Sequence, residues 1–152
     1  MPAKKLKEFL DSNGVKYESV SHSPAYSAQR VAASAHISGK ELAKTVIVRV
    51  DGEFAMAVLP ASCRVHLGHL KSALSASHAE LATEAEVEKL FPDCEKGAVP
   101  PFGNLYDLDV YVAEQLTGDE EIVFSAGTHK ELMRTSYKDF ARLVDPKVIA
   151  LT

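Results

Sequence analysis

The sequence predicts a single α+β domain with a mixed β-sheet flanked by helices. Helical and β-rich runs interrupt each other irregularly, whereas a doubly wound parallel sheet requires their regular alternation. Asp51-Gly52 lies between two β-rich runs, which is the strongest short signal for an antiparallel hairpin. A chain of 152 residues buries a core large enough to need no disulfide or metal for stability. We therefore expect residues 1–152 to form one domain.

A short helix and a strand are expected first. Leu6, Phe9 and Leu10 fall on one face of a helix. Asn13-Gly14 can end that helix, because both residues tolerate the left-handed conformation. Residues 15–20 alternate loosely between apolar and polar side chains, as a half-buried strand does.

The next segment leads into the hairpin. A helix is expected over 27–35 and a brief helical turn over 38–44, since a serine stands at each candidate N-cap. The hairpin strands are expected over 45–50 and 53–59. Both strands carry apolar side chains on either side of the pleat, which predicts central rather than edge strands.

Capped helices and strands alternate in the rest of the chain. Leucines recur at helical spacing between 67 and 74, and residues 83–86 have the spacing of a capping box before a helix that Pro92 stops. A last helix is expected after Ser136, its candidate N-cap. Further strands are expected over 79–82, 105–112, 122–126 and 131–135.

Composition limits the partners of the chain. Acidic residues number 21 against 17 lysines and arginines, for a net charge of −4. Non-specific binding to nucleic acid depends on neutralising many phosphates, so this balance argues against a DNA partner and leaves contact with one nucleic-acid end open. No apolar run is long enough to span a bilayer, and the first residues contain no apolar leader. We expect a cytoplasmic protein without a membrane partner.

The most constrained stretch is the apolar loop Gly97-Ala98-Val99-Pro100-Pro101-Phe102-Gly103. Its two prolines fix their own φ angles, and its two glycines can adopt dihedrals closed to other residues. Because proline has no N–H, the free amide donors of the loop concentrate at Gly97, Ala98 and Val99. The loop is either a structural turn or a rigid holder for a ligand oxygen or a water molecule.

Two isolated residues are candidates for the same chemistry. Lys44 stands at the expected start of a buried strand, where its ammonium could hold a phosphate or polarise an ester carbonyl, or could simply be solvated. His129 follows the small residues 125–128 at the end of another strand. A histidine there can donate, accept or titrate at a ligand, or form a local hydrogen bond in a turn.

Two other patterns have simpler explanations than function. Cys63, His66 and His69 are residue types that bind zinc, but nothing in their spacing brings the three side chains together. Basic residues recur every four positions from Lys130 to Arg142, but this segment crosses a strand and a helix start. Such a pattern favours a solvated face over a nucleic-acid footprint.

In combination, four segments resemble the YbaK/prolyl-tRNA-synthetase-associated domain family, the free-standing and appended aminoacyl-tRNA deacylases. The resemblance runs over nearly the whole chain from the helix expected at 27–35, and it is specific because the segments occur together. They are Lys44-Thr45-Val46-Ile47-Val48, Met56-Ala57-Val58-Leu59-Pro60, the loop Gly97 to Gly103, and Ser125-Ala126-Gly127-Thr128-His129.

The resemblance implies a compact domain with a barrel-like mixed sheet and an editing pocket without metal or organic cofactor. The catalytic roles of the family would fall on Lys44, Gly97, Ala98 and His129. The implied reaction is hydrolysis of the ester that joins a wrong amino acid to its tRNA. Contacts to the substrate would come from Thr45, Val99, Pro100, Pro101, Phe102, Gly103, Gly127 and Thr128.

The resemblance does not select one amino acid. Members that clear alanine often carry Asn after the lysine, whereas this chain has Thr45. Members closer to the cysteinyl-tRNA editors share Lys-Thr, but their glycine-proline loop usually differs. We expect a small residue such as Ala, Ser or Cys, because a small pocket does not strongly exclude near-isosteres.

The expected partner is the acceptor end of an aminoacyl-tRNA. Because an acidic chain neutralises few phosphates, a synthetase or the tRNA elbow is expected to supply the remaining affinity. The competing interpretation is a non-catalytic module that binds a nucleotide, an amino acid or a partner peptide in the same pocket. Deacylation of a panel of mischarged tRNAs separates these two interpretations.

Overall fold

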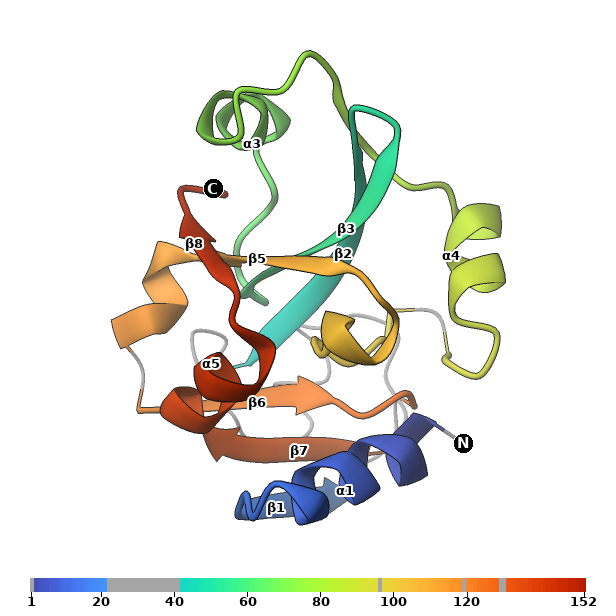
Figure 1. Cartoon of the computed structure of the whole chain (residues 1–152), viewed down its shortest axis with the longest axis vertical. Helices are drawn as coiled ribbons and strands as arrows, with labels where there is room; N and C mark the ends of the chain where they lie inside the picture. The colour runs from blue at the N-terminus through green and yellow to red at the C-terminus, as the bar shows by residue number, and fades with distance from the viewer. Residues whose placement is uncertain (1, 22–41, 96, 119, 129–130) are drawn as a thin grey trace.

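The computed structural model describes residues 2–21, 42–95, 97–118, 120–128 and 131–152. Two β-sheets, one above the other in Figure 1, form the centre of the molecule, and helices lie against their outer faces and ends. The helix expected over 27–35, the first part of the turn expected over 38–44, and His129 lie outside the described residues.

A three-stranded antiparallel sheet carries the N-terminal helix and the last helix. Its strand order is β1-β7-β6, with β1 at Tyr17–Ser21, β7 at Glu131–Ser136 and β6 at Glu121–Ser125. The predicted first helix is α1, Pro2–Ser12, and α5 spans Tyr137–Val144. Figure 1 shows α1 crossing beside β1 and β7.

A five-stranded mixed sheet has the order β4-β2-β3-β5-β8. The hairpin strands β2 and β3 pair antiparallel and lie inside the sheet, as predicted, and β5 and β8 add in parallel. Asp51 and Gly52 both have positive φ, at 48° and 85°, which is the turn that an Asp-Gly hairpin requires. The strands are Ala43–Val50 (β2), Glu53–Pro60 (β3), Ala79–Leu81 (β4), Asp109–Ala113 (β5) and Lys147–Ile149 (β8).

The two sheets do not close into a barrel. Between the described strands they are joined by one isolated parallel bridge, from Leu42 to Val123. The expectation of a mixed sheet flanked by helices is therefore confirmed, although the described strands do not form a closed barrel. The bridge nevertheless places the start of β2 beside β6.

The five-stranded sheet is buried on both faces. Met56 and Val58 of β3 face a core shared with α1, α5 and the three-stranded sheet. Ala57 and Leu59 face a second core beneath α3, which spans Leu67–Ala73. Burial on both sides explains why the hairpin strands are apolar almost throughout.

Local sequence signals set most helix ends. The capping box predicted at Thr83 is formed with Glu86 and begins α4, Glu84–Leu90. Ser136 accepts a hydrogen bond from the Asp139 amide at the start of α5, as predicted. The described residues contain no helix long and apolar enough to cross a membrane.

Two expected elements have other bounds in the structure, and two further elements were not expected. Residues 43 and 44 belong to β2 rather than to a helical turn, because they pair with Pro60 and Leu59. The strand expected over 105–112 begins only at Asp109, after a 3-10 helix over Gly103–Leu105. β8 was not expected, and a second 3-10 helix spans Glu114–Gly118.

Candidate functional site

The glycine-proline loop is anchored to the end of β6 by two backbone hydrogen bonds. The Glu95 amide donates to the Gly127 carbonyl, and the Gly127 amide donates to the Ala98 carbonyl, each at 2.8 Å. Gly127 has φ of +100°, a conformation that glycine adopts without strain. Two predicted site segments, separated by about thirty residues of sequence, are therefore adjacent.

Within the loop, a tight turn presents Gly97. The Ala98 amide donates to the Glu95 carbonyl at 3.0 Å, and Gly97 has φ of +78°. Ala98 is fully buried. The sequence-based expectation that Ala98 offers a free amide is therefore wrong. Among the described residues, the amides of Gly97 and Val99 find no hydrogen-bond partner.

The second half of the loop belongs to the core. Pro100 and Pro101 are buried, and the ring of Phe102 is fully buried against Phe124 and Phe140. Their expected contact with substrate stays a prediction. In the structure they pack in the core and hold the backbone that presents Gly97.

Gly103 is likewise a position of tight packing. A Cβ atom there would lie 2.6 Å from both the Leu108 carbonyl oxygen and Val110 Cγ2. Only glycine fits this approach of two backbone segments. The expected contact of Gly103 with substrate stays a prediction.

Lys44 lies near the start of β2, opposite Leu59, and is partly buried. Burial lowers the pKa of its ammonium, while Cys63 raises it and Arg64 lowers it further. Because side chains alternate along a strand, Lys44 and Thr45 project from opposite faces of β2. Lys44 therefore lies on the side of Cys63 and the second core.

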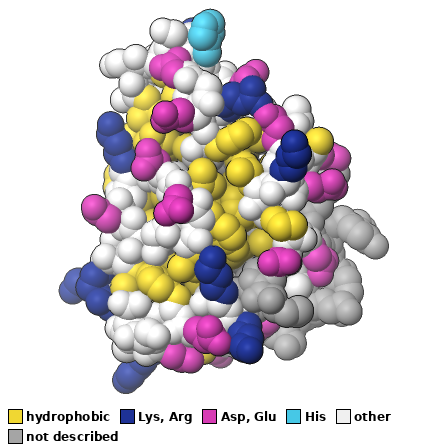
Figure 2. All heavy atoms as spheres, turned by 45° about the vertical axis from the view of Figure 1, so that its right-hand side comes forward, with side chains coloured by type: hydrophobic (Ala, Val, Ile, Leu, Met, Phe, Trp, Pro, Cys, Tyr) yellow, Lys and Arg dark blue, Asp and Glu magenta, His cyan; other side chains and the backbone are white. Residues whose placement is uncertain are grey.

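An open cavity of about 320 Å³ lies on the Thr45 side of β2. Figure 2 shows hydrophobic side chains gathered in the middle of this face of the molecule. Strand β2, β4, helix α4 and the loop form its walls. The lining residues are Thr45, Val46, Ile47, Leu81, Ala82, Glu84, Val87, Glu88, Phe91, Cys94, Glu95, Gly97 and Val99.

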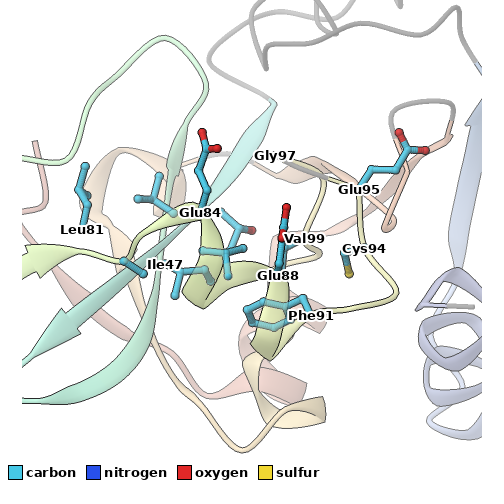
Figure 3. Close-up of a pocket in the computed structure, with 13 residues that line it drawn as sticks. Ile47, Leu81, Glu84, Glu88, Phe91, Cys94, Glu95, Gly97 and Val99 are labelled. Atoms are coloured by element: carbon cyan, nitrogen blue, oxygen red, sulfur yellow. The ribbon is translucent and has the colours of Figure 1, made fainter.

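The cavity has an apolar floor and an acidic edge. Figure 3 shows the carboxylates of Glu84 and Glu88 pointing away from the ring of Phe91. Among the described residues, no lysine or arginine lines the cavity. Arg49 of β2 is instead engaged by Glu86 of α4 and, at 3.5 Å, by Glu80. An acidic edge repels phosphate and favours a neutral or cationic group.

Cys94 is the one thiol among the lining residues, and it is not activated. Its Sγ lies 3.9 Å from the Tyr106 hydroxyl. Burial raises the pKa of the thiol, so the reactive thiolate is disfavoured. The arrangement does not support covalent catalysis through Cys94.

The cavity unites some of the predicted site residues and leaves others apart. Thr45, Gly97 and Val99 line it, whereas Lys44 does not. Thr128 follows Gly127, which is hydrogen-bonded to the loop, and Thr128 itself interacts with another residue. The contribution of α4 was missed, because the sequence of residues 83–92 indicates only a capped helix and does not show that Val87 and Phe91 line a cavity. The apolar spacing of a helix gives no signal that part of the stripe faces a cavity.

The histidines of the Cys63 segment have structural partners. His66 caps α3 by accepting from the His69 amide at 3.1 Å, and the two rings stack with centroids 3.8 Å apart. His69 Nδ1 lies 2.7 Å from the Thr152 carbonyl oxygen. No group of three or more potential metal ligands occurs among the described residues.

Among the described residues, the basic side chains from Arg134 to Arg142 do not form one stripe. Arg134 belongs to β7 and pairs with Glu18 at 3.7 Å, whereas Arg142 belongs to α5 and pairs with Asp139 at 3.4 Å. The pattern crosses a strand and a helix, as predicted. These residues give no continuous nucleic-acid footprint.

Comparison with known proteins gives a consistent set of matches. A family model described as an aminoacyl-tRNA editing domain matches residues 22–143. A curated relative from Escherichia coli K12, named multifunctional Ser/Thr-tRNA deacylase ProXp-y, is 27% identical over 151 residues. That alignment covers 95% of this chain and 89% of the relative.

Two crystal structures share the fold. One, of a hypothetical protein, has a TM-score of 0.87 at 21% identity and covers 97% of this chain and 98% of its own. The other, of a proposed trans-editing enzyme for prolyl tRNA synthetase, has a TM-score of 0.82 at 23% identity. It covers 99% of this chain and 96% of its own.

Proposed function

Because the chain belongs to the aminoacyl-tRNA editing domain family, we propose that this aminoacyl-tRNA deacylase removes small amino acids of the Ala, Ser or Cys class from mischarged tRNA. The observation that supports this most is the family match together with the anchoring of the Gly97 loop on Gly127. Serine is the first substrate to test, because the E. coli relative is named a Ser/Thr-tRNA deacylase.

The reaction needs little chemical assistance from side chains. An aminoacyl ester is already reactive, so holding a water molecule in place and stabilising the oxyanion are sufficient for hydrolysis. The protonated thiol of Cys94 fits this scheme, which uses no nucleophilic side chain. We therefore assign catalysis to positioning and electrostatics.

Lys44 is proposed to supply positive charge. It lies at the end of β2 that is bridged to β6, and its ammonium is partly removed from water. In such surroundings a charge acts more strongly on a phosphate or an ester carbonyl than it does in bulk water. Its place on the opposite face of β2 from Thr45 puts this charge away from the acidic edge of the cavity.

The loop is proposed to supply an amide. Gly97 is exposed, whereas the amide of Ala98 is used within the turn, so the water or the developing oxyanion would be held by Gly97 rather than by Ala98. His129 directly follows Thr128 in the sequence, and we propose that it shapes the amino-acid pocket or orients the α-amine.

The proposed partner is the acceptor end of the tRNA, with a synthetase as a further partner that recruits the chain. A panel of tRNAs carrying Ala, Ser, Thr, Cys, Leu or Phe tests the substrate class. We expect faster release of the small residues than in the absence of protein, and no effect on Leu or Phe. Equal inactivity on all six tRNAs would contradict the proposal and favour a binding module.

A further inference from the structure

We propose that Cys63 and Lys44 form an acyl-acceptor site, at which an acyl thioester transfers its acyl group first to the Cys63 thiol and then to the Lys44 amine. Acylation removes the positive charge of Lys44, and the resulting regulation of deacylation rests on the proposed function. The transfer itself depends only on the two side chains. Neither the sequence motifs nor the comparisons assign a role to Cys63.

The backbone brings the thiol and the amine to the same face of the five-stranded sheet. Lys44 pairs with Leu59 across the hairpin, so these two side chains project from one face side by side. Directly after β3 the Cys63 amide donates to the Pro60 carbonyl at 2.9 Å, which turns the chain. Cys63 then packs against the second core, which contains Leu59. The thiol and the amine therefore lie beside the same part of that core.

The surroundings of Lys44 favour its reaction as an amine. Burial lowers the pKa of the ammonium, the ionised thiol of Cys63 raises it, and the Arg64 guanidinium lowers it. The net pKa is below the ordinary value, so more of the nucleophilic neutral amine is present at a given pH. Among the described residues no carboxylate pairs with Lys44. Lys44 is therefore a better nucleophile than an ordinary exposed lysine.

The transfer takes two steps and needs no oxidant or reductant. The Cys63 thiolate attacks the carbonyl of the acyl thioester, a new C–S bond forms, and the thiol of the donor leaves. The neutral Lys44 amine then attacks the same carbonyl, an amide bond forms, and the Cys63 sulfur leaves and takes up the proton that the amine loses. Because both groups belong to one folded chain, the second step is intramolecular and is accelerated by proximity.

The product changes the charge of the candidate site. An amide at Lys44 is neutral, so it no longer supplies positive charge to a phosphate or an ester carbonyl. It also carries no penalty for a buried charge, and we expect the acylated protein to stay folded. Cys63 is partly exposed, so a donor reaches its thiol from solvent. The partial burial of both groups favours a small acyl group such as acetyl.

The inference is tested by incubating the protein with acetyl-CoA and following acetylation of each lysine by peptide mass spectrometry. Lys44 should be acetylated about tenfold faster than Lys71, which is exposed on α3 and serves as an internal reference. Cys63→Ser should lower the rate at Lys44 to that at Lys71. Cys94→Ser is the matched control and should leave the rate at Lys44 unchanged, because Cys94 lines the cavity on the other face of β2.

A second variant tests the order of the two steps. Lys44→Arg keeps the charge but lacks a nucleophilic amine, so the acetyl group should accumulate on Cys63 as a thioester that hydroxylamine cleaves. Equal acetylation of Lys44 in wild type and Cys63→Ser would overturn the inference. So would acetylation of Lys44 no faster than that of Lys71, or the absence of a hydroxylamine-labile acetyl group on Cys63 in Lys44→Arg.

Deacylation of mischarged tRNA before and after acetyl-CoA treatment separates this inference from the proposed function. Treated wild type should lose activity in proportion to acetylation of Lys44, whereas Cys63→Ser should keep its activity. An active protein in which Lys44 takes up no acetyl group would overturn the inference alone. Acetylation that depends on Cys63, in a protein that deacylates none of the tRNAs, would contradict the proposed function and support the acyl-acceptor site.

Discussion

The two glycines of the loop 97–103 have different structural roles. Gly97 has positive φ, is exposed and lines the cavity. Gly103 is buried, and its missing Cβ makes room for the Leu108 carbonyl. The sequence places both in one motif, but only the structure separates the residue that lines the cavity from the residue that permits packing.

Substitution of each glycine by alanine should separate activity from stability. Gly97→Ala is expected to cost about 1 kcal/mol of unfolding free energy, since alanine is strained at this φ. Its deacylation rate should fall by about tenfold or more, because the changed backbone conformation would turn the amide of residue 97 away from the substrate. Gly103→Ala should cost about 2–3 kcal/mol through the clash with Leu108. Urea denaturation and single-turnover kinetics measure both effects.

The opposite pattern would contradict this division. If Gly97→Ala unfolds the protein as readily as Gly103→Ala while retaining its rate per folded molecule, the loop is a structural turn only. Gly118→Ala is a control, because nothing lies within 4 Å of a Cβ atom at that position.

The charged ammonium of Lys44 lowers the stability of the folded protein. Burial lowers the pKa of its ammonium below the ordinary value of 10.5, so the folded state disfavours the charged form. The penalty is fully present at neutral pH and is relieved as pH rises from the lowered pKa toward 10.5. A residue kept charged against such a penalty fits a functional role.

Lys44→Met should therefore leave the protein at least as stable as wild type at pH 7. Its advantage in melting temperature is expected to shrink as pH approaches 10.5, the ordinary value for lysine. Thermal denaturation at several pH values measures this trend. A melting temperature clearly below that of wild type at pH 7 would show instead that Lys44 contributes to packing.

At the scale of elements, Glu131 of β7 links α1 to the three-stranded sheet and also bonds to the neighbouring strand β1 of that sheet. Its carboxylate lies 2.6 Å from Lys7 Nζ and accepts from the Ser19 hydroxyl at 2.5 Å. Burial raises the pKa of this carboxyl, but the hydrogen bonds from Lys7 and Ser19 outweigh burial and hold it below the ordinary value. The link follows directly after residues 129–130 and fixes the start of β7.

Glu131→Gln should destabilise the protein by about 1 kcal/mol at pH 7, the value for a partly exposed charged hydrogen bond. Because the folded pKa is lowered, this contribution is present above the ordinary value of 4.5 and is lost as pH falls through the folded pKa. Urea denaturation at pH 7 and at pH 3 should show the difference shrinking. A difference independent of pH would show that the charge has no part in it.

The elements with local signals were predicted well. The hairpin at Asp51-Gly52 and the caps at Thr83 and Ser136 depend on neighbours within four residues, so the sequence shows them directly. β8 was missed because it is short and exists through pairing with β5, more than thirty residues earlier. The late start of β5 has a similar origin, since the close approach at Gly103 determines it.

At the scale of the whole molecule, the resemblance predicted which segments form the candidate site but not which of their residues are buried and which line the cavity. It correctly brought the Gly97 loop beside Gly127. It did not show that Phe102 is buried in the core, or that Lys44 and Thr45 face opposite sides of β2. The spacing of residues in a motif contains no information about which side chains are buried. The acid-edged cavity under α4 depends on packing between segments far apart in the chain, which the sequence does not report.

The most direct test of the account is the rate at which serine is released from a preformed tRNA mischarged with serine, measured with the wild-type protein, Lys44→Met and the control Lys71→Met. Lys71 is exposed on α3, away from the cavity-lining residues. The account predicts rapid release by wild type and Lys71→Met, and release by Lys44→Met close to the spontaneous rate. Release by the wild-type protein no faster than spontaneous hydrolysis would contradict it.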